Sequence, residues 1–206
     1  MGSDVDSTVH NRDLIVNAAL ELVDEAGVAG LTMRRVAERS GLALGTVTHH
    51  FISRDELVEE CLERFYLQLE QLRREFEAEI EGESDPRALT EKAVRTLFRW
   101  AIKNRRLNRL RVITTATRGG LVPARFESSM VPFVELAARY FERHSRRSAV
   151  ELKLLCYSTA SLVGRSLAMD APAQMQALTE TASIERCWDA METFYVGLVC
   201  SYVFGD

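Results

Sequence analysis

The chain has 206 residues, of which 47% are hydrophobic and 27% are charged. This apolar content is enough for a buried core, and no uninterrupted apolar run reaches the roughly 18 residues that a membrane-spanning helix needs. The polar residues 1–13 lack the apolar stretch of a signal peptide, so we expect a cytoplasmic protein.

Charge is unevenly distributed along the chain. The net charge of −4 argues weakly against nucleic-acid binding, because neutralising phosphates requires local Lys and Arg. Residues 59–85 are strongly acidic, whereas residues 92–125 hold ten basic side chains and no acidic one. We expect these two segments to face each other or solvent, in preference to forming a site for an anionic ligand.

Apolar residues recur at spacings of three and four, and only four prolines occur, so we predict an all-α fold. A first amphipathic helix ends at Gly27, a usual residue just past a helix end. Thr32 is a good N-cap for a short second helix through Arg39, residues 40–42 form a tight turn, and a third short helix covers about 43–50. Three short helices in so few residues are typical of a helix-turn-helix.

Capping boxes and helix breakers define the remaining helices. Ser53 and Glu56 form a capping box that starts a long helix over residues 54–81, and Ser148 and Glu151 form a second. Further helices are predicted over residues 86–103, 107–117, 123–141, 148–169 and 183–203, while the stretch after residue 172 shows no clear pattern. We therefore expect a helix-turn-helix DNA-binding domain over residues 10–57 and a regulatory ligand-binding and dimerisation domain over residues 58–206, linked by helix 54–81.

The segment LTMRRVAERS followed by GLALGTVTHHFISRDEL resembles the N-terminal DNA-binding domain of the TetR family of bacterial transcriptional regulators. The resemblance covers roughly residues 12–57, and its specificity comes from many elements in combination. These elements are Ala18, Gly27, Gly30-Leu31-Thr32, Val36-Ala37, Gly41, Gly45, Val47, His50-Phe51, Arg54 and Leu57.

Elementary packing agrees with this resemblance. Gly41 allows the turn a positive φ, and the small Ala37 lets the second and third helices cross closely. Val47 and Phe51 are expected to point inward. The outward residues of the third helix, which would enter the major groove of DNA, are then Ala43, Leu44, Thr46, Thr48 and His49.

The resemblance implies which residues touch DNA. In the family the position of Arg34 often reaches a base edge, and an arginine can bond guanine O6 and N7 bidentately. Arg54 stands where the family usually has a lysine that contacts phosphate, and such contacts fix register without reading sequence. Four positions of the third helix also commonly touch phosphates: Thr46, Thr48, His49 and His50. The expected DNA contacts are Arg34, Leu44, Gly45, Thr46, Thr48, His49, His50 and Arg54.

Two positions depart from the family pattern. The position of Thr48 is usually tyrosine, and Ala43 stands where a serine or similar cap is common, so both reduce polar contacts to the DNA backbone. We expect Leu44 and Thr46 to pack against thymine methyl groups instead. Seven acidic residues against five arginines over residues 12–57 predict modest, salt-sensitive affinity.

The helices over residues 148–169 and 183–203 have broad apolar stripes. Two such helices from each chain would form a four-helix homodimer core, which the resemblance favours; the alternative is that they close only the protomer's own core. A two-fold dimer would present its reading helices about 34–36 Å apart, or somewhat further, to a near-palindromic operator. The expected interface residues are Leu155, Thr159, Leu162, Trp188, Met191, Tyr195, Leu198 and Tyr202.

The middle helices contain more aromatic residues than a linker requires. By resemblance this region encloses a pocket for a small, mainly apolar effector, whose binding tilts helix 54–81 and shifts the population away from the DNA-competent spacing. Repression is the family's commoner mode. The expected pocket residues are Phe98, Ile102, Leu110, Ile113, Met130, Phe133 and Val134.

Two other functions compete with this interpretation. An all-helical small-molecule sensor or carrier that does not read DNA is supported by the weak positive charge of residues 12–57. An enzyme is disfavoured because no nucleophile with a base at recognisable spacing and no glycine-rich phosphate loop occurs. We expect no cofactor and no metal, since His49 and His50 point about 100° apart on a helix, and the four cysteines lie far apart without a CxxC pair.

Overall fold

A computed structural model describes residues 2–80, 85–119, 123–169 and 172–205. Every regular element in these ranges is helical, which confirms the predicted all-α fold. None of these helices is both long enough and apolar enough to cross a membrane. The chain divides into two compact units, Met1–Leu67 with Arg106–Gly120 and Gln68–Arg105 with Leu121–Asp206, and the long helix α4, Arg54–Ile80, contributes residues to both.

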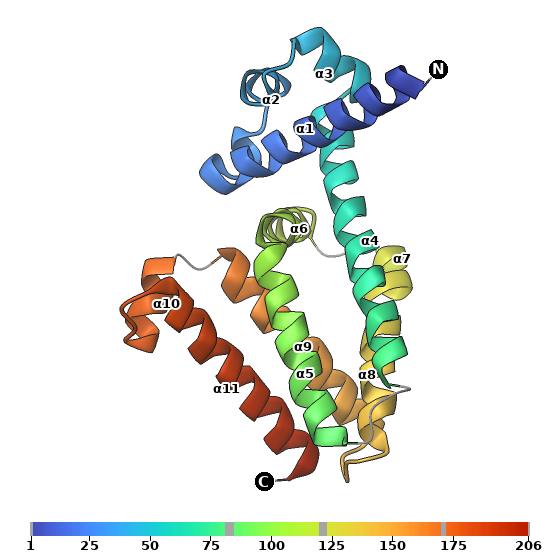
Figure 1. The fold of residues 1–206 in the computed structure, drawn as a ribbon, viewed down its shortest axis with the longest axis vertical. Coiled ribbons are helices and arrows are strands. Elements are labelled where there is room, and N and C mark those ends of the chain that lie inside the picture. The colour runs from blue at the N-terminus through green and yellow to red at the C-terminus, as the bar shows by residue number, and fades with distance from the viewer. Residues whose placement is uncertain (1, 81–84, 120–122, 170–171, 206) are drawn as a thin grey trace. The chain divides into compact units, whose positions relative to one another are not determined.

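The first unit contains the helix-turn-helix (Figure 1). Its elements besides the start of α4 are α1 (Gly2–Ala26), the 3-10 turn η1 (Val28–Gly30), α2 (Met33–Ser40), α3 (Leu44–His50) and α6 (Arg105–Thr117). Helix α2 packs against both α1 and α3. The predicted end of the first helix and the bounds of the second and third are therefore confirmed to within a residue or two, while α1 begins at Gly2, well before the apolar face that predicted it.

Local chemistry fixes the ends of α2 and α3. The Thr32 hydroxyl oxygen accepts a hydrogen bond from the Arg35 backbone N–H at 3.3 Å, as expected of an N-cap. Gly41 adopts φ 71° and ψ 16°, a left-handed conformation that costs glycine little, and its N–H donates to the Ala37 carbonyl. Ala37 and Val47 are buried, so the two short helices are held by apolar contacts on their inner faces.

The predicted capping box starts α4 with a small shift. Ser53 Oγ accepts from the Glu56 N–H at 3.2 Å, but the Glu56 carboxylate accepts from the N–H of Ile52 and not from that of Ser53. Both bonds satisfy donors that the first turn leaves unpaired. The helix therefore begins where the sequence predicts, directly after the buried Phe51.

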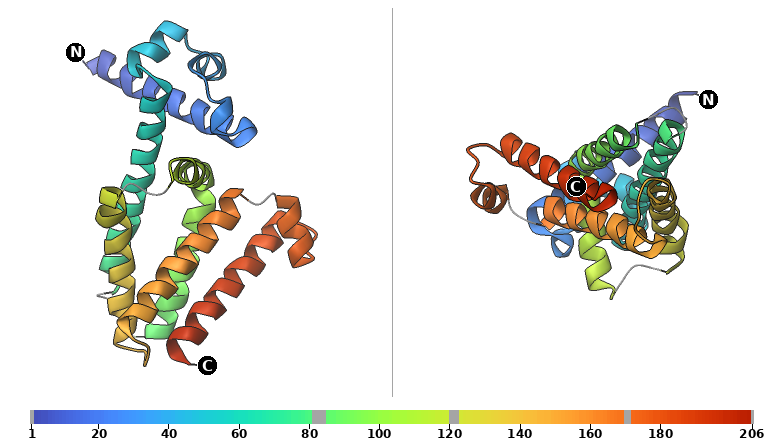
Figure 2. Two further views of the ribbon diagram at one scale, coloured as in Figure 1. Left: turned by 180° about the vertical axis from the view of Figure 1, so that it is seen from behind. Right: turned by 90° about the horizontal axis from the view of Figure 1, so that it is seen from below.

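The second unit is a helical bundle. Its elements besides the end of α4 are α5 (Pro86–Lys103), α7 (Pro123–Arg125), the π-helical turn η2 (Phe126–Met130), α8 (Val131–Glu142), α9 (Ala149–Met169), α10 (Pro172–Thr179) and α11 (Ile184–Phe204). Both views in Figure 2 place α9 (orange) and α11 (red) as neighbours, and α5 packs against both. The predicted cap at the start of α9 is present as a side-chain hydrogen bond of Ser148, and side chains of Asp85 and Ser183 cap the starts of α5 and α11.

Two elements of the second unit are irregular or short. The helix expected over 123–141, with an irregular start around its prolines, does begin irregularly: a π-helical turn precedes Pro132, whose missing N–H removes one bond of the helical ladder. Helix α10 was not predicted, because Met175 is its one buried residue and a short helix with one buried side chain has no apolar periodicity.

The basic segment 92–125 pairs with α4 only in part. Lys92 and Arg118 do bind acidic residues of α4, but other basic residues reach acids on α1 and α11, which the sequence could not indicate. These pairs include Lys92–Glu79, Arg118–Glu59, Arg106–Glu21, Arg106–Asp24, Arg109–Asp24, Arg95–Glu192 and Arg99–Glu192.

Candidate DNA-binding surface and ligand cavity

Helix α3 has one buried face and one open face. Val47 points inward and is fully buried, whereas Leu44, Gly45, Thr48 and His49 are exposed. Thr46 and His50 are half-buried at the edges of the open face. Seven of the eight expected DNA contacts therefore lie on α3 or at Arg54, the first residue of α4, and the eighth, Arg34, lies on α2.

Arg34 is the most available arginine of the helix-turn-helix. Its side chain is 83% exposed, and its Nε lies 3.2 Å from Glu38 Oε1 one turn along α2. Such an exposed i,i+4 pair contributes only a few tenths of a kcal/mol, about 0.3–0.5. The guanidinium can therefore exchange Glu38 for another acceptor at little cost.

Two other arginines are occupied in holding the unit together. Arg39 binds both oxygens of Glu25 at 2.7 Å and so joins α2 to α1. These hydrogen bonds raise the pKa of Arg39 and lower that of Glu25. Arg12 binds Glu60 at 2.6 Å and stacks 4.4 Å from the centre of the Phe51 ring. These contacts distinguish structural arginines from those that can reach DNA.

The polar residues of the open face have defined hydrogen-bonding states. The Thr48 hydroxyl donates to the Leu44 carbonyl at 3.0 Å, so its oxygen is left to act as an acceptor. Burial, and then the nearby charges of His49 and Arg12, lowers the pKa of His50. His50 is therefore neutral at pH 7, and it suits a hydrogen bond better than an ion pair. Arg54 forms an ion pair with the adjacent Asp55 at 3.1 Å.

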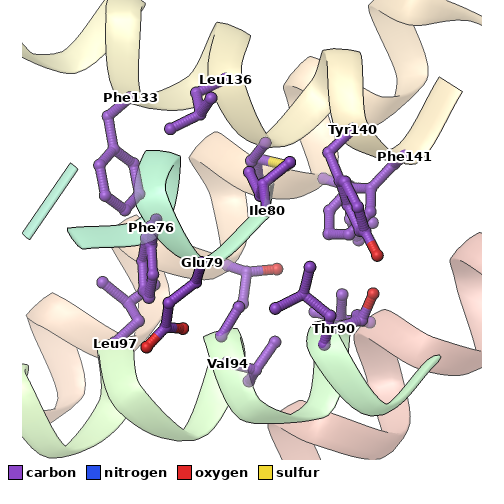
Figure 3. A pocket seen from close by; sticks show the side chains of 17 residues that line it. Phe76, Glu79, Ile80, Thr90, Val94, Leu97, Phe133, Leu136, Tyr140 and Phe141 are labelled. Atoms are coloured by element: carbon purple, nitrogen blue, oxygen red, sulfur yellow. The ribbon is translucent and has the colours of Figure 1, made fainter. Parts of the chain in front are cut away.

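The second unit encloses a cavity of about 90 Å³ (Figure 3). It lies among the end of α4, α5, α8, α9 and Val199 of α11, and its walls are mostly apolar and aromatic. Phe76, Phe133 and Tyr140 are among the rings that line it. This composition is typical of a site for a small apolar molecule.

Of the seven residues expected to line a pocket, one lines this cavity. Phe133 lines the cavity, and the other six lie elsewhere because helical periodicity marks an apolar face without saying which part of it meets a void. Phe98 and Ile102 pack in the cluster around Cys187. The remaining four are Leu110 and Ile113 on α6 and the buried Met130 and Val134.

The residues that the sequence reasoning missed include two from α4. Phe76 and Ile80 line the cavity, and both belong to the apolar stripe from Leu57 to Ile80 that predicts this helix. That stripe continues past the residues needed to pack the helix-turn-helix. Its extra length is the feature of the sequence that could have indicated Phe76 and Ile80 as residues of a second apolar site.

Few polar groups face the cavity. The Thr90 hydroxyl donates to the Pro86 carbonyl at 2.8 Å, and the Tyr140 hydroxyl lies 3.4 Å from the same oxygen. Burial raises the pKa of the Cys156 thiol to about 12, so this cysteine stays protonated and is a poor nucleophile. Glu79 is the one carboxylate among the described lining residues, and its Oε1 lies 3.1 Å from Lys92 Nζ.

The predicted dimer-interface residues divide into an inner and an outer set. Leu162 and Leu198 are exposed, as an interface requires. Thr159, Met191 and Tyr195 are buried inside the protomer instead, because the apolar stripes of α9 and α11 are wide enough to serve the protomer core as well. Leu155 lines the cavity, and Trp188 and Tyr202 are half-buried.

Two further large apolar residues of α9 and α11 are exposed. Leu154 of α9 is 59% exposed and Phe194 of α11 is 63% exposed. With Leu162 and Leu198 they form a set that we call the outer apolar residues. A shallow hollow on α11, lined by Phe194, Gly197 and Leu198 among others, lies on the same helix face.

The fold and the exposed reading helix define the class of protein: an all-α protein with an amino-terminal helix-turn-helix. Residues 15–61 match the family model described as "Bacterial regulatory proteins, tetR family". Over these residues the chain matches the DNA-binding domain of the TetR family.

Individual relatives match a short stretch of the chain. The HTH-type transcriptional regulator BetI 1 of Chromohalobacter salexigens is 35% identical over 51 residues, which are 25% of this chain and 25% of that protein. The chain thus spans well under half the length of the curated relatives it matches.

Solved structures extend the likeness of fold to nearly the whole chain. The regulator FadR from Bacillus subtilis in complex with stearoyl-CoA has a TM-score of 0.61 at 12% identity, covering 91% of this chain and 97% of that one. AibR in complex with isovaleryl coenzyme A and operator DNA has a TM-score of 0.63 at 13% identity, covering 92% and 97%. At these identities the likeness shows a shared fold.

Proposed function

We propose that the protein is a ligand-responsive transcriptional regulator that binds a near-palindromic operator as a homodimer and acts as a repressor. The observation that supports DNA binding most directly is the open face of α3 together with the exposed arginine Arg34 on α2, which pairs with the exposed Glu38. The Gly41 turn holds α2 and α3 in the arrangement that places a second helix in the major groove.

The homodimer is supported by the outer apolar residues Leu154, Leu162, Phe194 and Leu198. Monomeric proteins rarely expose a large contiguous apolar surface, and two α-helices from each protomer are sufficient for a four-helix core. A two-fold axis through α9 and α11 would relate two copies of α3, as a near-palindromic operator requires.

Ligand control is supported by the position of the cavity on α4. Phe76, Glu79 and Ile80 line it, and the same helix begins at Arg54, within the expected DNA contacts. A ligand that prefers one arrangement of α4 would shift the population between states that bind the operator and states that do not. Two proteins of similar fold bind acyl-CoA molecules, one of them together with operator DNA.

The proposal is tested by selecting bound genomic fragments with the purified protein at low salt. We expect a near-palindromic site for the wild type and its loss in Arg34→Ala. Arg74→Ala is the matched control, because Arg74 also forms an exposed i,i+4 pair, with Glu70, but lies outside the helix-turn-helix. Enrichment that survives Arg34→Ala unchanged contradicts the role of Arg34.

A second candidate is an all-helical small-molecule sensor or carrier that does not read DNA. Its support is electrostatic, since Arg12 and Arg39 are bound within the unit and acidic residues outnumber arginines over residues 12–57. Absence of any enriched fragment at low salt, with the cavity still binding a ligand, would favour this function.

A further inference from the structure

Among the described residues that line the cavity, Glu79 has a carboxylate oxygen without a hydrogen-bond partner. Glu79 Oε1 binds Lys92 Nζ at 3.1 Å, but Oε2 is buried and has no hydrogen-bond partner among the residues that the structure describes. An unsatisfied buried acceptor is unfavourable by about 1–3 kcal/mol, and by more when it is charged. Glu79 Oε2 is therefore ready to accept a hydrogen bond from a molecule in the cavity.

The surroundings of Glu79 favour a ligand over bound water. A buried water needs two to four polar partners. The Thr90 hydroxyl hydrogen is already donated to the Pro86 carbonyl. Tyr140 lies away from Glu79 (Figure 3). Phe76, Val94 and Leu97 are apolar lining residues. This combination suits a molecule with an apolar body and a single hydrogen-bond donor.

The size of the cavity limits the apolar part of such a ligand to about one ring. A dry cavity of about 150 Å³ holds benzene, and this cavity has about 90 Å³ before any side chain moves. A long acyl chain does not fit in this volume. A carboxylate or phosphate ligand would also place a negative charge against Glu79, which is unfavourable in an apolar environment.

We propose that the cavity binds a small aromatic or aliphatic amine, whose ammonium donates to Glu79 Oε2 while Lys92 holds Oε1 from the exposed side. This inference rests on the proposed ligand-binding role of the cavity and names its ligand class. The ammonium replaces its lost hydration with a charge-assisted hydrogen bond, and the ring covers apolar wall.

The test compares three probes that share one ring and differ in the head group: benzylamine, benzyl alcohol and benzoate. Their dissociation constants are measured by calorimetry on the full chain. We expect benzylamine to bind about tenfold to a hundredfold more tightly than benzoate, with benzyl alcohol between them, because a hydrogen bond to a charged group contributes about one to two powers of ten in affinity.

Three variants assign the preference to Glu79. Glu79→Gln should remove the advantage of benzylamine, whereas Glu77→Gln, a neighbouring carboxylate bound to Arg73, should leave it unchanged. Lys92→Gln removes the competing cation and should tighten benzylamine binding, which keeps the inference testable if Glu79→Gln folds poorly.

The outcomes separate this inference from the proposed function. Equal or tighter binding of benzoate, no binding of any probe, or an unchanged preference in Glu79→Gln would each overturn the amine assignment. Binding of benzylamine that depends on Glu79 but leaves operator affinity unchanged would sustain the ligand class and contradict ligand-controlled regulation.

Discussion

The buried carboxylate of Glu192 gives the most quantitative prediction about stability. Its side chain is 9% exposed, and it accepts hydrogen bonds from Arg95 at 2.8 Å and from Arg99 at 3.0 and 3.1 Å, joining α11 to α5. Burial raises the pKa of Glu192, but the hydrogen bonds from Arg99 and Arg95 lower it more, so the net pKa is below its ordinary value of 4.5. The stabilisation is present above pH 4.5 and is lost as pH falls through the lowered value.

The two sides of this cluster should respond unequally to mutation. Replacing both arginines by methionine leaves a buried carboxylate without counter-charge, which is unfavourable by about 3–5 kcal/mol. We expect the lower end, about 3 kcal/mol, because Arg95 and Arg99 are 39% and 70% exposed and solvent screens the pairs. Glu192→Gln leaves two guanidinium groups that water can solvate. This substitution should lower the free energy of unfolding by about 1 kcal/mol.

The free energy of unfolding is measured by urea titration at pH 7, and the melting temperature by circular dichroism. For a chain of this size about 1 kcal/mol corresponds to about 2–4 °C, so the double arginine variant should melt about 6–12 °C lower and Glu192→Gln about 2–4 °C lower. Glu91→Gln is the control, because its pair with Arg87 on α5 is exposed and should contribute under about 0.5 kcal/mol. If Glu192→Gln destabilises as much as the double arginine variant, the reasoning from burial is refuted.

Three further predictions concern DNA binding, assembly and pH. Arg54→Ala should weaken operator and nonspecific DNA binding alike and lower the slope of log affinity against log salt by about 1; a change in sequence preference would contradict a phosphate contact. Leu198→Glu should yield a folded monomer by light scattering and circular dichroism, since Leu198 is exposed in the protomer, and a persistent dimer would exclude this face. Because the folded pKa of His50 lies below 6.5, its contribution to stability is present above pH 6.5 and is lost as pH falls toward the lowered value. His50→Gln should therefore flatten the loss of stability between about pH 7.5 and 5.5, and an unchanged slope would show that burial of His50 is not its cause.

Local interactions made most of the secondary structure predictable. Caps such as Thr32, Ser148 and Ser183 act within three or four residues, and Gly41 needs only its own backbone conformation, so the ends of these helices follow from short stretches of sequence. The open and buried faces of α3 follow in the same way, because the 3.6-residue period decides which side Val47 and Thr48 share with their neighbours.

Interactions between distant residues were outside the reach of the sequence. Arg34 and Arg39 belong to one short helix, yet one is exposed and the other binds Glu25, fourteen residues before it. The sequence could not show which of the two arginines is exposed and which is paired. The partner of a long side chain depends on how the helices are rotated against each other.

By itself the sequence determined most of the helices, several of their caps and the helix-turn-helix with its outward residues. The tertiary structure decided which apolar residues fill the core, which line the cavity and which stay exposed: Tyr195 went to the core, Phe76 to the cavity and Phe194 to the surface. All three are large aromatic residues on apolar stretches of helix. Only the helices packed around each one determine which of these environments it occupies.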